Sequence, residues 1–149
     1  MSRLVKLDPV SISEDALARL TGWRIVLDGA PRTKKTSNRI IRAGNRRRIL
    51  PSKAHERWFG AVFPKLAQVA GLLAPRLPLR VPVNVAATFY RDAERGDAVG
   101  YYQALADLLE RAGVVENDVL IRSWDGSRLR KDAAYPRIEL EIFPCGPGR

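Results

Sequence analysis

Two aspartates that flank one predicted helix are the residues of this chain best suited to chemistry. Asp97 stands where the helix is expected to begin, and Asp118 follows the turn after its end. Carboxylate oxygens are the ligands that Mg²⁺ and other hard cations prefer. If the surrounding strand, helix and turn gather these acids in one place, the spacing predicts a metal site.

Each aspartate also has a purely structural interpretation. Asp97 is placed to be the N-cap of the helix, because an aspartate there accepts a hydrogen bond from a free backbone amide. Asp118 follows Asn117 and fits a turn residue. A third acid would complete a metal site, and the first candidate is Asp125, seven residues after Asp118. Asp125 and Gly126 also form an ordinary turn pair.

A predicted strand leads into this region. Residues 81–90 are rich in β-branched and aromatic side chains, which favours a strand, and Pro82 restricts its start to an edge or a first position. Asp92 and Glu94 interrupt the pattern and lie in the loop before the helix. These two acids are the alternatives to Asp125 for the third metal ligand.

An amphipathic helix is predicted between the two aspartates. Its apolar residues recur at a spacing of three to four, and Gly113 ends it. At about 100° per residue, Val99 and Gln103 fall on the face opposite Tyr101 and Leu105. Val99 is thus an apolar residue where a polar one is expected, which indicates a substitution at this position.

Residues 96–118 resemble the core of the RusA-type Holliday junction resolvases. The family signature reads approximately Asp-x-Asp-Asn, a lysine on the same helix, an Ala-Gly helix end, and then Asp-Asp. The first family aspartate falls on Asp97, the helix end on Ala112–Gly113, and the last aspartate on Asp118, preceded here by Asn117. The resemblance implies the fold of this family, with a small mixed sheet.

Three positions depart from the family pattern. Val99 stands where the family has its second aspartate, Gly100 where it has its asparagine, and Gln103 where it has its helix lysine. In the family the second aspartate is a metal ligand and the lysine assists cleavage. The resemblance therefore implies the fold more strongly than the activity.

The activity that the resemblance implies is resolution of Holliday junctions or other branched DNA by a homodimer that makes paired nicks. Asp97 and Asp118 would be catalytic and would bind Mg²⁺, with Mn²⁺ as a substitute, and Asp125 is our choice of third ligand. Mg²⁺ neutralises charge on the scissile phosphate and generates hydroxide near neutral pH. Two alternatives stay open: a junction-binding protein that has lost cleavage through Val99 and Gln103, and a basic RNA-binding or structural protein.

A strongly basic segment at residues 32–57 also predicts nucleic-acid binding. It contains ten lysines and arginines and one acid, so it holds nine of the ten net positive charges. Apolar pairs on both sides of Gly44–Asn45 predict a β-hairpin, whose side chains would grip phosphates rather than read bases. A smaller basic group follows at 127–132. The residues predicted to contact DNA are Lys34, Lys35, Arg39, Arg42, Arg46, Arg47, Arg48, Lys53, Arg57 and Lys131.

The composition bounds the class of protein. A net charge of +10 and a pI near 10.5 indicate a polyanionic partner, nucleic acid first and an anionic membrane surface second. The alternative for the basic segment is a solvated arm that binds any polyanion. The single Cys145 excludes an internal disulfide framework and a multi-cysteine zinc site. Neither a signal peptide nor a membrane-spanning run is recognised, so we expect a cytoplasmic protein without membrane contact.

The predicted fold is one α+β domain over residues 1–149, a small mixed sheet with two main helices packed on one side. Residues 1–20 are interpreted as a leader with one short helix and residues 144–149 as a loose tail. The remaining predicted elements are a strand at 23–27, a helix at 52–70, and strands at 121–124 and 137–142.

Several residues of the first of these two helices carry specific expectations. Ser52 is a good N-cap. Pro64 should kink the helix or divide it near Ala61, because proline lacks an amide hydrogen. His55 is expected in the exposed first turn, as a phosphate contact or a spectator rather than a metal ligand. Trp58 is expected in the core or at a subunit interface rather than stacked on an unpaired base.

Overall fold

The computed structural model describes residues 4–7, 10–13, 23–34, 39–44, 46–50, 52–74 and 76–145. Its helices and strands are, in chain order, β1 (Leu4–Leu7), β2 (Val10–Ser13), β3 (Trp23–Asp28), β4 (Arg39–Ala43), β5 (Arg46–Leu50), α2 (Lys53–Leu72), β6 (Val83–Arg91), α3 (Ala98–Arg111), the 3₁₀ helix η1 (Asp118–Leu120), β7 (Ile121–Ser123), β8 (Arg128–Lys131) and β9 (Arg137–Pro144).

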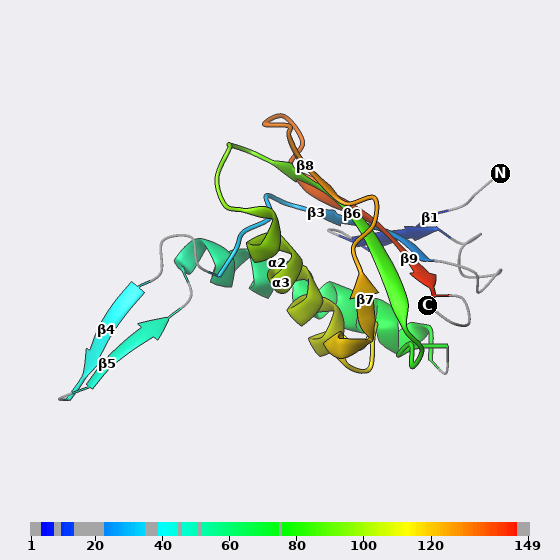
Figure 1. Cartoon of the computed structure of the whole chain (residues 1–149), viewed down its shortest axis with the longest axis horizontal. Coiled ribbons are helices and arrows are strands. Elements are labelled where there is room, and N and C mark those ends of the chain that lie inside the picture. Colours follow the sequence, from blue (N-terminus) through cyan, green and yellow to red (C-terminus); the bar gives the residue numbers. More distant parts are fainter. Residues whose placement is uncertain are drawn as a thin grey trace.

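Seven strands form one mixed sheet. Their order is β1-β2-β3-β9-β6. On the other edge of β6, its first residues pair with β7 and its last residues pair with β8. The pairings of β6 with β7 and β8 are parallel, and the others are antiparallel. Both helices, α2 and α3, lie on one side of the sheet (Figure 1). The predicted α+β fold is therefore confirmed.

The core lies between the sheet and the two helices. Successive residues of β6 alternate between buried and partly exposed, and so do those of β9, because side chains of a strand point to opposite faces. The strict alternation that predicted the last strand is thus confirmed. The buried side chains of β6 that face the helices are Val83, Val85, Ala87 and Phe89, and those of α3 that meet them include Tyr101, Leu105 and Leu108.

The helix α2 is continuous through Pro64, so the prediction that this proline divides it is wrong. A proline in a helix leaves the carbonyl four residues earlier without a donor and its ring crowds that residue. Here that residue is the exposed Gly60, which has no side chain, and its carbonyl can bond to water. The N-cap prediction is confirmed, since the Ser52 hydroxyl accepts a hydrogen bond from the His55 amide at 3.1 Å.

The start of the chain differs from the predicted leader. Residues 4–7 and 10–13 form β1 and β2, which pair with each other and extend the sheet beyond β3. The β2 segment, Val-Ser-Ile-Ser, alternates apolar and polar residues, whereas β1, Leu-Val-Lys-Leu, does not, and both are only four residues long, so their strand pattern was missed. The short helix expected after Ser13 lies outside the described residues, as do residues 146–149 of the expected tail.

The predicted basic hairpin is present as a separate two-stranded sheet. Strands β4 and β5 pair only with each other, from Arg39 opposite Leu50 to Ala43 opposite Arg46. Gly44 has a φ of +65° in the turn, a conformation that glycine adopts without strain. In Figure 1 this hairpin projects away from the rest of the molecule.

Candidate metal and nucleic-acid site

Asp97 begins α3. Its Oδ1 accepts a hydrogen bond from the Gly100 amide at 2.8 Å, so it is the N-cap of the helix, and its side chain is exposed. At the other end Gly113 has a φ of +84° and follows the last helical turn. The structural role inferred for Asp97 from the sequence is thus confirmed, and its carboxylate remains open to solvent.

Asp118 lies beyond the other end of α3. It is the first residue of η1, where the Asn117 side chain accepts a hydrogen bond from the Val119 amide at 3.0 Å. The Asp118 amide donates to Oε1 of Glu110, in the last turn of α3, at 3.2 Å. Asp118 is exposed to solvent.

The length of α3 separates these two acids. The helix has 14 residues, which at 1.5 Å per residue gives roughly 21 Å between its ends. A carboxylate oxygen lies about 2.1 Å from a bound Mg²⁺, so one ion cannot contact Asp97 and Asp118 of the same chain. The expectation that strand, helix and turn gather these acids in one place is wrong for a single chain. Among the described residues no three histidine, cysteine, aspartate or glutamate side chains could hold a metal ion.

Asp125 lies at the opposite end of β6 from Asp97. Asn84, the second residue of β6, accepts a hydrogen bond from the Asp125 amide at 2.9 Å and donates one to its carbonyl at 3.1 Å. Ser123 donates to the same Asn84 oxygen at 2.6 Å. These bonds hold the turn of Asp125 near the start of β6, whereas Asp97 follows its end. Asp125 is exposed and cannot share an ion with Asp97 of the same chain.

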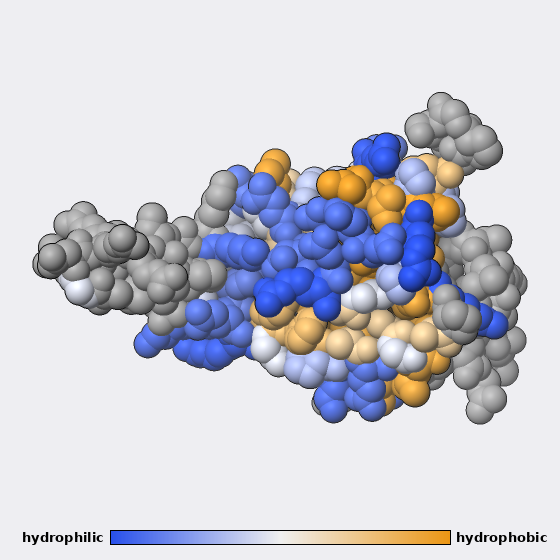
Figure 2. Space-filling view, turned by 90° about the horizontal axis from the view of Figure 1, so that it is seen from below, coloured by the Kyte–Doolittle hydropathy of each residue, from blue (hydrophilic) through white to orange (hydrophobic). Residues whose placement is uncertain are grey.

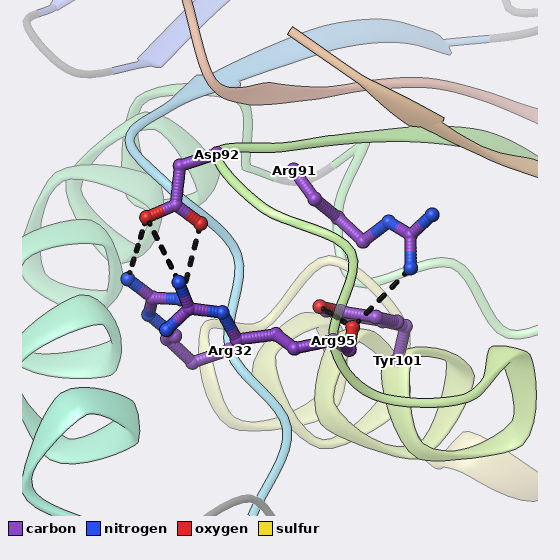
Figure 3. Close-up of polar contacts among 5 residues, drawn as sticks. All are labelled: Arg32, Arg91, Asp92, Arg95 and Tyr101. Atoms are coloured by element: carbon purple, nitrogen blue, oxygen red, sulfur yellow. Dashed lines mark hydrogen bonds and ion pairs between the residues drawn. The ribbon is translucent and has the colours of Figure 1, made fainter. Parts of the chain in front are cut away.

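Asp92, the alternative third ligand, is engaged by arginines (Figure 3). Arg32 contacts both its carboxylate oxygens, at 3.1 and 2.9 Å, and Arg95 lies 3.6 Å from one of them. Burial raises the pKa of Asp92, but the hydrogen bond and the positive charge of Arg32 outweigh it and the pKa lies below its usual value. Asp92 therefore fixes the segment after β3 against the loop before α3, and is not free for a metal.

The loop that carries Asp97 is fixed at its midpoint. Both the Tyr101 hydroxyl, at 2.7 Å, and the Arg91 guanidinium, at 3.3 Å, donate to the Arg95 carbonyl. Burial raises the pKa of Tyr101, so its hydroxyl keeps the proton that it donates. Three arginines, Arg32, Arg91 and Arg95, surround this loop and are balanced in number by its three acids, Asp92, Glu94 and Asp97.

Close packing explains why no asparagine stands at position 100. A Cβ on Gly100 would lie 2.6 Å from Oδ1 of Asp97 and 3.1 Å from Cγ2 of Thr33, which is buried. Gly96 has a φ of +78° and is also packed against Thr33 and Tyr101. The family asparagine could enter here only if Thr33 and the Asp97 cap moved. Its absence is therefore a feature of the local packing.

The other two departures from the family pattern lie on the open face of α3. Val99 is 59% exposed, as its position opposite the buried side of the helix predicts, and Gln103 is exposed as well. Beyond the far end of α3, Val119 is 65% exposed. An exposed valine thus stands beside each of the two aspartates, Asp97 and Asp118.

The predicted DNA contacts are placed unequally. Lys53, Arg57 and Lys131 are exposed, whereas Lys34 forms an ion pair of 3.1 Å with Asp107. Figure 2 shows hydrophilic side chains gathered towards the hairpin, with most apolar ones farther from it. The predicted contacts whose side chains lie outside the described part are Lys35, Arg39, Arg42, Arg46, Arg47 and Arg48. For these, the prediction stays a prediction.

His55 is buried, so the prediction of an exposed first turn is wrong. Only 5% of its surface is accessible, because its ring lies 5.9 Å from those of Trp58 and Phe59, centre to centre. Burial lowers the pKa of His55, and the Lys34 charge lowers it further. His55 cannot contact a phosphate in this position. Trp58 is also buried, as expected for a core residue.

Sequence reasoning placed Arg32, Arg128 and Arg130 in basic segments but did not predict them, or Arg95, as site residues. Arg32 and Arg95 hold Asp92, and Arg128 and Arg130 of β8 point to the face of the sheet away from the helices. The sequence pattern that could have indicated the shared face of Arg128 and Arg130 is strand alternation, because the apolar Leu129 separates them.

No protein-family model matches this chain, and no curated protein matches it. The resemblance to the RusA-type resolvases therefore depends on the residues quoted above, and their activity comes to this chain as a proposal. Neither described helix is both long and apolar enough to cross a membrane.

Proposed function

We propose that this protein is a RusA-type endodeoxyribonuclease that cleaves branched DNA with Mg²⁺ and acts as a homodimer. The observation that carries the proposal is that Asp97 and Asp118, both exposed, lie beyond the two opposite ends of α3. These two acids also fall on the first and last aspartates of the family pattern. Two copies of the chain can bring together what one copy holds apart.

A two-fold axis across α3 makes the helices of two copies antiparallel. In a two-fold dimer a contact of residue i with residue j of the partner is made twice. Asp97 would then face Asp118 of the partner subunit at one end of the helix pair, and Asp118 would face the partner's Asp97 at the other. The dimer would have two equivalent acidic pairs, as paired nicks in a two-fold symmetric junction require.

The exposed valines support this pairing. The same antiparallel arrangement brings Val99 against Val119 of the partner subunit, next to each pair of acids. Both side chains are more than half exposed in the single chain, at 59% and 65%, and their burial would stabilise the dimer. Val99 in place of the family aspartate would then serve the interface and not the metal.

The chemistry divides between the ion and the protein. A Mg²⁺ ion held by two carboxylates supplies charge neutralisation at the scissile phosphate and an activated water. Asp97, fixed by its bond to the Gly100 amide, gives one ligand in a set orientation. Arg91 and Arg95, which lie in or next to the loop that carries Asp97, would contact the phosphate at that end of α3.

Mixed dimers test the shared site. Asp97→Asn and Asp118→Asn chains, carrying different tags and purified through both, form dimers with one intact acidic pair and one pair without either acid. We expect each pure variant to be inactive on a labelled four-way junction with Mg²⁺, and the mixed dimer to make single nicks. Mixed dimers as inactive as the pure variants would contradict a site shared between copies.

The second candidate function is binding of branched DNA without cleavage. It is favoured by the lack, among the described residues of one chain, of a group able to hold a metal, and by Val99 and Gln103 in place of family site residues. A four-way junction incubated with Mg²⁺ or EDTA separates the two. A shifted but uncut junction under both conditions would favour the binding protein.

A further inference from the structure

The sheet has an open groove on the face away from the helices. There β6 presents the small side chains of Ala86 and Thr88, between the taller side chains of β9 on one side and β8 on the other. The groove has a volume of about 330 Å³ and is lined mainly by polar and charged residues. Neither helix covers this face, so it is accessible in the single chain (Figure 1).

One wall of the groove is basic. Arg128 and Arg130 both line it, while Leu129 between them packs against the core, so β8 alternates as a half-buried strand should. Two residues along a strand span about 6.7 Å, which sets the spacing of these guanidinium groups. Both arginines are exposed, and neither has an ion-pair partner among the described residues.

The opposite wall carries both charges. Glu139 and Glu141 of β9 line it, Arg24 of β3 lies across from Glu141, and Glu139 is within 3.4 Å of the Arg137 guanidinium. An anionic chain would be attracted less by this mixed wall than by β8, whose two arginines have no acid beside them in the lining. The charge pattern therefore places a polyanion along β8 rather than across the middle of the sheet.

We propose that Arg128 and Arg130 form a second contact surface for the DNA backbone, binding one duplex arm while the β4–β5 hairpin binds another. The inference rests on the proposed function, because it takes branched DNA as the partner. Figure 1 shows the hairpin projecting away from the main body, and β8 as a separate edge of the main sheet above the helices. In this proposal each of two arms that diverge from a branch point contacts one of the two regions, and a linear duplex makes one of these contacts. The second surface would thus select branched over linear DNA.

The competing explanation is protective. Charged side chains on an edge strand prevent it from pairing with another sheet, and β8 is an edge strand. That role predicts self-association of an arginine-free variant and no change in DNA affinity. Binding measurements therefore distinguish the two explanations.

The test measures binding of the full-length protein in EDTA, so that cleavage plays no part. Arg128→Gln and Arg130→Gln should each weaken binding to a four-way junction several-fold and lower the slope of log K against log salt by about 0.9, the value for one phosphate contact. The loss should be smaller on a linear duplex of the same length. Glu141→Gln should have the opposite effect and tighten junction binding.

Lys65→Gln is the matched control, since Lys65 is an exposed cation on α2, away from the groove. The proposed second contact surface is wrong if Arg128→Gln and Arg130→Gln behave like Lys65→Gln. It is also wrong if they weaken binding to the linear duplex as much as binding to the junction. Circular dichroism of each variant checks that the sheet is intact. Failure of the unmodified protein to bind any DNA would instead overturn the proposed function together with this surface.

Discussion

At the scale of single residues, Asp97 combines two roles that substitution can separate. It caps α3 through Gly100 and, in our proposal, binds the metal. Asparagine is as good an N-cap as aspartate but lacks the charge, whereas alanine loses both. We expect Asp97→Asn to abolish nicking with unchanged stability and junction binding, and Asp97→Ala also to lose about 1 kcal/mol of stability.

Urea unfolding and a nicking assay of the two variants check this prediction. A free energy of unfolding of Asp97→Asn equal to that of the unmodified protein is the control, because it shows that the start of α3 is still capped. Nicking by Asp97→Asn at the rate of the unmodified protein would remove Asp97 from the metal site and leave it only the role of a cap.

His55 makes stability depend on pH. Burial and the charge of Lys34 lower its pKa in the folded state from the usual 6.5. Below pH 6.5 the unfolded chain therefore binds a proton that the folded chain does not, so stability falls with decreasing pH until the lowered pKa is reached. We expect the free energy of unfolding, measured by urea denaturation, to decline over this window.

The control is His55→Phe, which keeps an aromatic ring beside Trp58 and Phe59 and has no proton to bind. With decreasing pH, the free energy of unfolding of His55→Phe should not show the decline that begins near pH 6.5 in the unmodified protein. An identical decline in both proteins would show that other groups, and not His55, cause it.

At the scale of elements, one tyrosine of the loop between β8 and β9 bonds this loop to β3. The Tyr135 hydroxyl donates to Asp28 of β3 at 2.6 Å, and the Arg137 guanidinium lies 4.4 Å from the centre of its ring. The hydrogen bond to Asp28, with partial burial, raises the pKa of Tyr135 to about 12. The bond therefore stabilises the folded chain below pH 10 and is lost as the pH rises through about 12.

Tyr135→Phe tests this loop. We expect a loss of about 0.5 kcal/mol, which is below the usual range for a hydrogen bond to a charged group because Tyr135 is nearly half exposed to solvent. Ultraviolet titration should lose one tyrosine that ionises near pH 12. A variant that retains this late-titrating tyrosine would assign the raised pKa to another residue.

Elements with a strong periodic pattern were predictable from the sequence, and spatial relations between their ends were not. The helix from Asp97 to Gly113 and the alternating strand β9 were found because burial imposes their spacing. The distance between Asp97 and Asp118 was misjudged because the loop after α3 was expected to return to the start of the helix. In the structure Asp118 stays near the end of α3, so the length of the helix separates the two acids. His55 was misplaced because the burial of a first turn depends on what packs over it.

At the scale of the whole molecule, the chain has two regions that can be studied apart. The main sheet and the two helices share one core, whereas β4 and β5 pair only with each other. The chain enters and leaves the hairpin region near Thr33 and Ser52, both buried in the main body. The hairpin therefore contributes charge to the molecule and no strand to its main sheet.

Removal of the hairpin should separate stability from DNA binding. Replacing residues 36–50 by a short Gly-Ser linker deletes five arginines, and at about 0.9 per phosphate contact the slope of log K against log salt should fall by up to about 4.5. The melting temperature should stay close to that of the complete chain, because the main core is unchanged. A matched variant with the five arginines changed to glutamine should lose the same slope if charge alone is responsible. If the deletion leaves the slope unchanged, the DNA contacts must lie on the main body, where β8 is the first surface to examine.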